Sequence, residues 1–177
     1  MAHKYAQIEL ERRWLLATLP EALHTSQEYQ LIEDRYLNGT PLRLRRTSDA
    51  SGTVTALKLT QKYQAADQSA YATTITNFYL DAASYALLET LPARVLVKRR
   101  YKLMNGRFPF SIDQFLGPLE GLVLAEIEQP DMASLLAIPH PTFARREVTE
   151  DYRFMGGELV GLTANQCQQF LRETGNW

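Results

Sequence analysis

The sequence contains few of the residues that build disulfides, zinc sites or thiol active sites. Its 177 residues include one cysteine, Cys167, and three histidines, His3, His24 and His140, which are far apart along the chain. A single cysteine cannot form a disulfide within the chain, and without a nearby histidine or second cysteine it is typical of a packed thiol. The sequence therefore predicts neither a disulfide framework nor a metal site built from histidine and cysteine.

A long apolar run and an excess of charge of one sign are also missing. No stretch is long enough to span a bilayer, and the segment Met1 to Tyr5 lacks the apolar core of a signal peptide. The formal net charge of -1 and the pI of about 6.3 argue against the basic footprint of a nucleic-acid-binding protein. We therefore expect a cytoplasmic protein that binds neither membrane nor nucleic acid. The length and the 45% hydrophobic content predict one domain, residues 1–177.

Charged residues recur at two-residue spacing in several segments that also carry apolar residues. Side chains two apart project from the same face of a strand, so each such segment would gather its charges on one side. The acids with this pattern, together with Asp113, face a comparable set of bases: Glu9, Glu11, Asp113, Glu126 and Glu128 against Arg13, Arg43, Arg45, Lys58, Lys98 and Arg100. One such strand would suggest a solvated face, but several favour a barrel with its charges inside. Lys62 has the same parity as Lys58 but lies near a strand end, so two placements stay open for its side chain: facing the lumen or facing solvent.

The rest of the pattern predicts a mainly β (α+β) fold with peripheral helices. Turn dipeptides such as Asn38-Gly39 and Asn105-Gly106 separate consecutive alternating segments, as hairpins require. Helices are predicted after Asp81, after Pro130-Asp131 and from Thr163 to near Gly175. The predicted strands cover residues 6–16, 26–36, 42–47, 54–62, 70–78, 94–103, 108–115, 123–128 and 146–152.

These motifs resemble the CYTH domain, also called the triphosphate tunnel metalloenzymes, which includes class IV adenylate cyclases, thiamine triphosphatases and inorganic triphosphatases. The segment Glu9-Leu10-Glu11-Arg12-Arg13 is similar to the ExExK signature of that family, with Arg13 in place of the usual lysine. The resemblance spans most of the chain and implies a closed antiparallel β-barrel tunnel of about eight strands. It continues through Tyr36-Leu37, residues 42–45, Lys58, residues 98–101, Asp113, residues 125–128 and residues 147–154.

One strand departs from the family pattern. Family members usually carry a further Arg and Glu-x-Glu strand about halfway along, and the matching segment here is residues 71–77. We assign Thr74 and Thr76 to the two carboxylate positions. Hydroxyl groups can hydrogen-bond a phosphate or a metal-bound water, but they supply no negative charge. This wall of the tunnel is therefore expected to be altered.

Paired carboxylates on two strands can hold a hard cation through oxygen ligands, and Mg²⁺ or Mn²⁺ suits a site that also accepts phosphate oxygens. We expect Glu9, Glu11, Glu126 and Glu128 to be the metal ligands and, with Arg13 and Lys58, the catalytic set. The expected substrate-binding residues are Arg13, Arg43, Arg45, Lys58, Lys98, Arg100 and Asp113, with Asp113 fixing one of the cations.

The resemblance implies a metal-dependent phosphohydrolase that acts on inorganic triphosphate or on the triphosphate of a small organic molecule. Two alternatives stay open: a class IV-type adenylate cyclase that produces cyclic AMP, and a triphosphate or polyphosphate sensor with low turnover. The expected partner is a small-molecule triphosphate. The oligomeric state stays open, a homodimer included.

Overall fold

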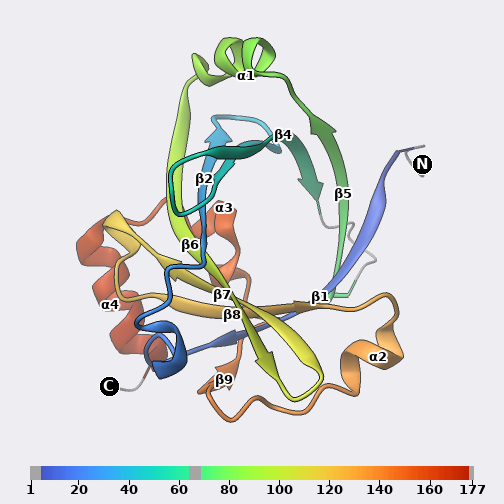
Figure 1. Cartoon of the computed structure of the whole chain (residues 1–177), viewed down its shortest axis with the longest axis vertical. Helices are drawn as coiled ribbons and strands as arrows, with labels where there is room; N and C mark the ends of the chain where they lie inside the picture. Colours follow the sequence, from blue (N-terminus) through green and yellow to red (C-terminus); the bar gives the residue numbers. More distant parts are fainter. Residues whose placement is uncertain (1–4, 64–68, 176–177) are drawn as a thin grey trace.

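Eight antiparallel strands close into a barrel in the computed structural model, which describes residues 5–63 and 69–175 (Figure 1). Around the ring the order is β5-β4-β3-β2-β6-β7-β8-β1, and pairing of β1 with β5 closes it, while β9 pairs with β1 outside the ring. The strands are β1 (Gln7–Leu15), β2 (Gln30–Leu37), β3 (Leu42–Ser48), β4 (Val54–Tyr63), β5 (Ala72–Tyr79), β6 (Ala93–Asn105), β7 (Phe108–Phe115), β8 (Val123–Glu128) and β9 (Arg146–Glu147). The predicted closed barrel is confirmed.

The hairpin turns follow from the predicted dipeptides. Gly39, between β2 and β3, has a φ of 71°, and Gly106, between β6 and β7, has a φ of 60°. Both values lie in the left-handed region that glycine adopts without steric cost, as tight hairpins demand. Two predicted strand boundaries differ from the structure by more than two residues. The second strand starts at Gln30 and not at residue 26, and β9 stops at Glu147 because Asp151 caps a 3-10 turn, η3 (Tyr152–Phe154).

The described residues form four helices: α1 (Ala82–Glu89), α2 (Met132–Leu136), α3 (Gly156–Leu159) and α4 (Ala164–Gly175). Asp81 and Asp131 cap α1 and α2 by accepting hydrogen bonds from the amides of Ser84 and Ser134. The predicted capping box also forms at α4, where the Thr163 amide donates to Gln166 Oε1 at 2.9 Å. Among the described residues, no helix has the length and apolarity needed to cross a membrane.

Two clusters of buried apolar side chains pack the helices against the barrel strands. The first lies at one end of the lumen, where Leu96, Phe115 and Leu124 pack with Phe154 and Leu159 from the segment around α3, and with α4. In Figure 1, α3 lies within the outline of the ring of strands. The second cluster packs side chains of β1, β6, β7 and β8 against α2, and comprises mainly Trp14, Tyr101, Phe110, Ile112, Ile127 and Leu135. One end of the barrel is therefore apolar and covered.

Candidate active site in the barrel lumen

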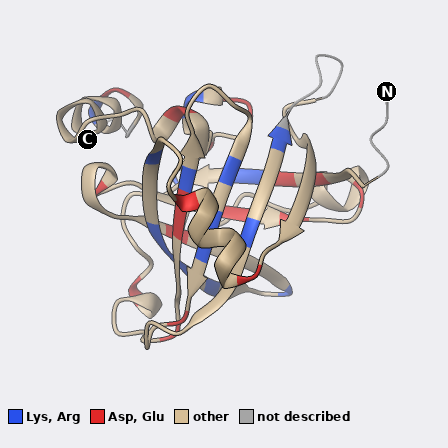
Figure 2. Ribbon diagram, turned by 90° about the horizontal axis from the view of Figure 1, so that it is seen from above, with Lys and Arg blue, Asp and Glu red and all other residues tan. Residues whose placement is uncertain are grey.

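Above this apolar end the barrel encloses a charged cavity of about 400 Å³. Figure 2 shows basic and acidic positions recurring along the strands of the ring. Among the described residues, the cavity is lined by six acidic side chains and six basic ones. They are Glu9, Glu11, Asp34, Glu126, Glu128 and Glu158, and Arg13, Arg43, Arg45, Lys62, Lys98 and Arg100. The charged inner faces predicted from strand parity are therefore present, and acidic and basic side chains line the cavity in equal number among the described residues.

Asp34 holds two of the arginines in place. It is 1% exposed, and Arg45 Nε and Nη2 donate to its two carboxylate oxygens at 2.6 and 2.7 Å. Arg43 Nε lies 3.4 Å from Asp34 Oδ1. Burial opposes ionisation of Asp34, but the two guanidinium groups outweigh it and hold the pKa of this carboxyl well below its usual range. Both arginines are thus fixed toward the cavity by an ionised buried partner.

The sequence prediction missed Asp34, because Glu33 and Arg35 flank it and hide the alternation. The register of β2 with β3 places Asp34 opposite Arg45 and Tyr36 opposite Arg43, so all four share the inner face. Tyr36 lines the same cavity. Burial, followed by the charge of Asp34, raises the pKa of its phenol group.

Asp113, on β7, plays the same part for two cations of the neighbouring strand β6. It is fully buried, and it accepts hydrogen bonds from Lys98 Nζ at 2.5 Å and from Arg100 Nε and Nη2 at 2.6 Å. Arg100 Nη2 also donates to Glu126 at 2.5 Å. Burial lowers the pKa of Lys98, although Asp113 partly offsets this effect. Asp113 stands behind the two cations and does not itself line the cavity, as expected of a residue that fixes them.

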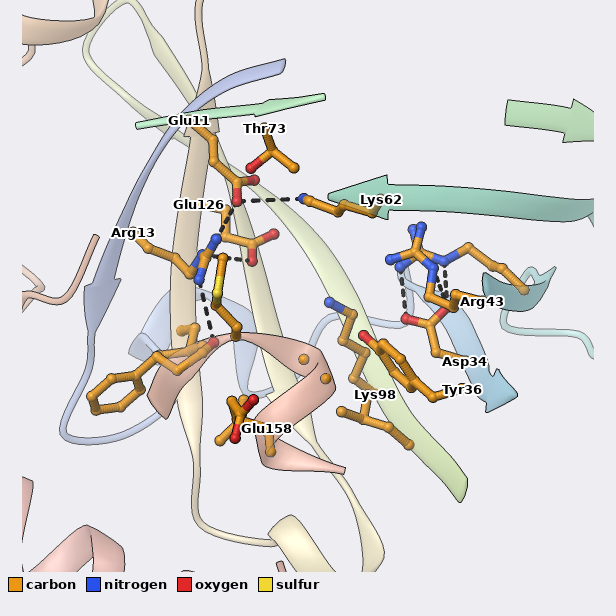
Figure 3. Close-up of a pocket in the computed structure, with 18 of the residues that line it drawn as sticks. Glu11, Arg13, Asp34, Tyr36, Arg43, Lys62, Thr73, Lys98, Glu126 and Glu158 are labelled. Atoms are coloured by element: carbon orange, nitrogen blue, oxygen red, sulfur yellow. Dashed lines mark hydrogen bonds and ion pairs between the residues drawn. The ribbon is translucent and has the colours of Figure 1, made fainter. Parts of the chain in front are cut away.

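The four candidate metal ligands lie on the adjacent strands β1 and β8. In their register Glu11 is opposite Glu128, and Arg13 is opposite Glu126. Arg13 Nη2 donates to Glu11, and Arg13 Nε lies 3.5 Å from Glu126. From β4, Lys62 Nζ reaches 3.4 Å from Glu9 and 3.7 Å from Glu11 (Figure 3). Lys62 therefore faces the lumen and not solvent.

These carboxylates match a hard divalent cation in donor chemistry, because all four supply oxygen. Partial burial and then the charges of Glu9 and Glu11 raise the pKa of Glu128, although the residue as a whole is exposed. No ion pair joins Glu128 to another described residue. For Glu126, burial opposes ionisation but Lys98, Arg100 and Arg13 together lower its pKa strongly. In residues 5–63 and 69–175, no three His, Cys, Asp or Glu side chains are arranged to enclose a metal as they stand. A cation would need Arg13 and Lys62 to release some of these oxygens.

The structure places two sequence-based candidates differently. Lys58 has the inward parity, but its Nζ lies 5.2 Å from the centroid of the Tyr79 ring, which is largely exposed, and Lys58 does not line the cavity. The assignment of Thr74 and Thr76 to the lumen was wrong. Directly paired residues share a face, and Thr73 is paired with Glu9 while Ile75 is paired with Lys62.

Thr73 and Ile75 therefore occupy the inner face of β5, and both line the cavity. The inner face of β5 therefore carries no carboxylate, as expected, but it is occupied by Thr73 and Ile75 and not by Thr74 and Thr76. The sequence prediction also missed Glu158, which comes from the short helix α3 and has no strand alternation to reveal it.

Comparisons with solved structures agree with this fold. Two solved structures of a protein named NE1496, one of them described as an inorganic triphosphatase, match with TM-scores of 0.57 and 0.56 at 24% identity; they cover 88% and 86% of this chain and 99% and 93% of theirs. A Bacillus halodurans protein provisionally named as an adenylate cyclase matches with a TM-score of 0.50 at 15% identity, over 84% of this chain and 99% of its own. The chain shares the fold of these proteins, which is the closed barrel that the CYTH resemblance implies.

At the level of sequence, the CYTH resemblance is supported by one segment. It is 44% identical over 66 residues to an inorganic triphosphatase of Acetivibrio thermocellus. The aligned segment is 37% of this chain and 41% of that relative, so the match spans less than half of either protein. No family model matches the chain.

Proposed function

We propose that this protein is a triphosphatase that uses Mg²⁺ or Mn²⁺ and cleaves inorganic triphosphate, or a small organic triphosphate, in the lumen of its CYTH barrel. The observation that carries the proposal is the lumen, in which six basic side chains converge on one cavity beside a wall of four glutamates. The partial similarity to an inorganic triphosphatase supports this choice of substrate.

The basic residues suit a polyphosphate chain. Arg43 and Arg45 on β3, and Lys98 and Arg100 on β6, can donate charge-assisted hydrogen bonds to phosphate oxygens. Since Asp34 and Asp113 already fix these cations, little side-chain freedom would be lost on binding. Preorganised positive charge is also the main contribution that a protein makes to phosphoryl transfer.

The acidic wall has a separate task. Glu9, Glu11, Glu126 and Glu128 would hold the divalent cation, which when bound neutralises charge on the phosphate oxygens. In the reaction, a water oxygen attacks the terminal phosphorus, the bond to the bridging oxygen breaks, and pyrophosphate leaves. Of these four carboxylates, we assign Glu128 to accept the proton of that water, because it lines the cavity and no ion pair joins it to another described residue.

A low-turnover sensor is the second candidate, and the inner face of β5 favours it. Thr73 and Ile75 line the cavity where carboxylates would strengthen cation binding. A lumen with its cationic cradle intact and this wall uncharged would retain a triphosphate better than it would cleave it.

A substrate panel separates these functions. Purified protein is incubated with tripolyphosphate, ATP and thiamine triphosphate, each with Mg²⁺, with Mn²⁺ or with EDTA. Phosphate, pyrophosphate and cyclic AMP are then measured. The proposal expects cation-dependent release of phosphate and pyrophosphate from tripolyphosphate. Cyclic AMP from ATP would identify the cyclase instead, and tight binding of tripolyphosphate without product would identify the sensor.

A further inference from the structure

Lys62 occupies an unusual position among the basic residues that line the cavity. Its ammonium group approaches Glu9 and Glu11, at 3.4 and 3.7 Å, from β4, which is separated from β1 only by β5. In Figure 3 the side chain points from β4 toward Glu11 and away from the arginines beside Asp34. Lys62 thus neutralises carboxylates that the proposed cation would use.

This pairing matters because the surroundings are largely shielded from water. Glu11 is 5% exposed, and burial opposes its ionisation, yet Arg13 and Lys62 together keep its pKa lowered. A divalent cation that approaches this wall alone would meet carboxylates already compensated by basic side chains and would be repelled by Lys62. A triphosphate that enters alone would find Lys62 engaged elsewhere. With six acids and six bases lining the cavity among the described residues, either ligand alone would leave the lumen with unbalanced charge.

We propose that Lys62 couples the binding of the divalent cation to that of the triphosphate. It pairs with Glu9 and Glu11 until the cation takes these carboxylates, and it then moves to a phosphate oxygen of the incoming chain. The cation replaces Lys62 as the partner of the two glutamates, and the triphosphate gives Lys62 a new partner. Each ligand should therefore bind more tightly in the presence of the other. This inference rests on the proposed function, because it assigns both ligands to the same lumen.

The chain offers a matched control on the same strand. Lys58 has the same parity as Lys62, but it lies over the Tyr79 ring and not against the carboxylates. Lys58→Met removes the same charge from the same face of β4 without breaking the contact with Glu9 and Glu11. Lys62→Arg keeps the charge and serves as the conservative variant.

The experiment measures binding by isothermal titration calorimetry, without turnover. Mn²⁺ alone, imidotriphosphate alone in EDTA, and Mn²⁺ with imidotriphosphate are each titrated into wild type, Lys62→Met, Lys62→Arg and Lys58→Met. The Mn²⁺–imidotriphosphate complex in buffer is measured separately and subtracted. We expect Mn²⁺ alone to bind on the order of tenfold more tightly to Lys62→Met than to wild type, and the coupling between the two ligands to fall by a similar factor. Lys62→Arg and Lys58→Met should behave like wild type.

Three results would overturn the inference. If Lys62→Met weakens imidotriphosphate binding but leaves the affinity for Mn²⁺ alone unchanged, Lys62 is a phosphate ligand without a coupling role. If Lys58→Met gives the same changes as Lys62→Met, the effect is general charge in the barrel and not the contact with Glu9 and Glu11. If wild type binds neither ligand, the proposed function fails and the inference fails with it.

Discussion

Replacing Asp34 by asparagine should destabilise the protein by leaving two buried guanidinium groups without their counter-charge. The asparagine keeps the shape of the side chain, but Arg45 loses a bidentate partner at 2.6 and 2.7 Å and Arg43 loses its ion pair at 3.4 Å. Removing one partner of a buried ion pair costs about 3–5 kcal/mol. At roughly 2–4 °C per kcal/mol for a chain of this size, Asp34→Asn should lower the Tm by about 6–20 °C.

The neighbouring residue provides the control. Glu33 lies on the opposite face of β2 and pairs with Arg46 at 2.9 Å, where the arginine side chain is 39% exposed. Exposed pairs contribute about 0–1 kcal/mol, so Glu33→Gln should change the Tm by only a few degrees. Both variants are compared with wild type by differential scanning calorimetry in EDTA.

Tripolyphosphate adds a second readout. In Asp34→Asn the ligand would compensate the uncovered arginines, and at a concentration of 100 Kd it should restore about 2.7 kcal/mol of stability. The gain in Tm from tripolyphosphate should therefore be at least as large in this variant as in wild type. Equal Tm losses in Asp34→Asn and Glu33→Gln, or no recovery with tripolyphosphate, would refute the assignment of Asp34 as the support of an anion-binding pair.

Three further outcomes follow from the same geometry. Glu126→Gln should lower cation-dependent turnover on the order of a hundredfold with the fold intact by circular dichroism; unchanged turnover at saturating cation would remove Glu126 from the site. Thr73→Glu adds a carboxylate opposite Glu9 and should tighten Mn²⁺ binding in calorimetry, whereas Thr74→Glu, on the other face, should not. The pKa values of Asp34 and Glu126 are lower in the folded state than their ordinary values of 3.8 and 4.5. Their contribution to stability is thus complete above those ordinary values and is lost as the pH falls below them, so the Tm should decline below about pH 4 and decline less steeply in Asp34→Asn.

The sequence predicts the barrel and most of its charged walls because charged and apolar residues alternate in several of the strands that line the lumen. Next to Glu9 and Glu11, and again next to Glu126 and Glu128, apolar residues alternate with the acids, so parity gathers the charges on one face, and the recurrence over several strands assigns that face to the lumen. The same rule works for Arg43 and Arg45. In each case the inner charges need no tertiary information to be recognised.

Other parts of the site depend on the register between strands. Residues 72–77 read Ala-Thr-Thr-Ile-Thr-Asn, in which threonine occupies both parities, and the pairing with β1 is what turns Thr73 inward. Lys58 and Lys62 share a parity, so their different distances from the carboxylates arise from position along the barrel. Glu158 belongs to a helix of four residues, which is too short to show a period.

The central claim is that the charged lumen is the site of triphosphate cleavage, and the most direct test compares two arginines of β3 that point to opposite faces. Phosphate release from tripolyphosphate is measured for wild type, Arg43→Ala and Arg46→Ala, with Mg²⁺ and with EDTA. Arg43 lines the cavity, whereas Arg46 pairs with Glu33 outside it. We predict cation-dependent release by wild type and Arg46→Ala, and a loss on the order of a hundredfold in kcat/KM for Arg43→Ala. Equal rates in the two variants, or release that continues in EDTA, would contradict the account.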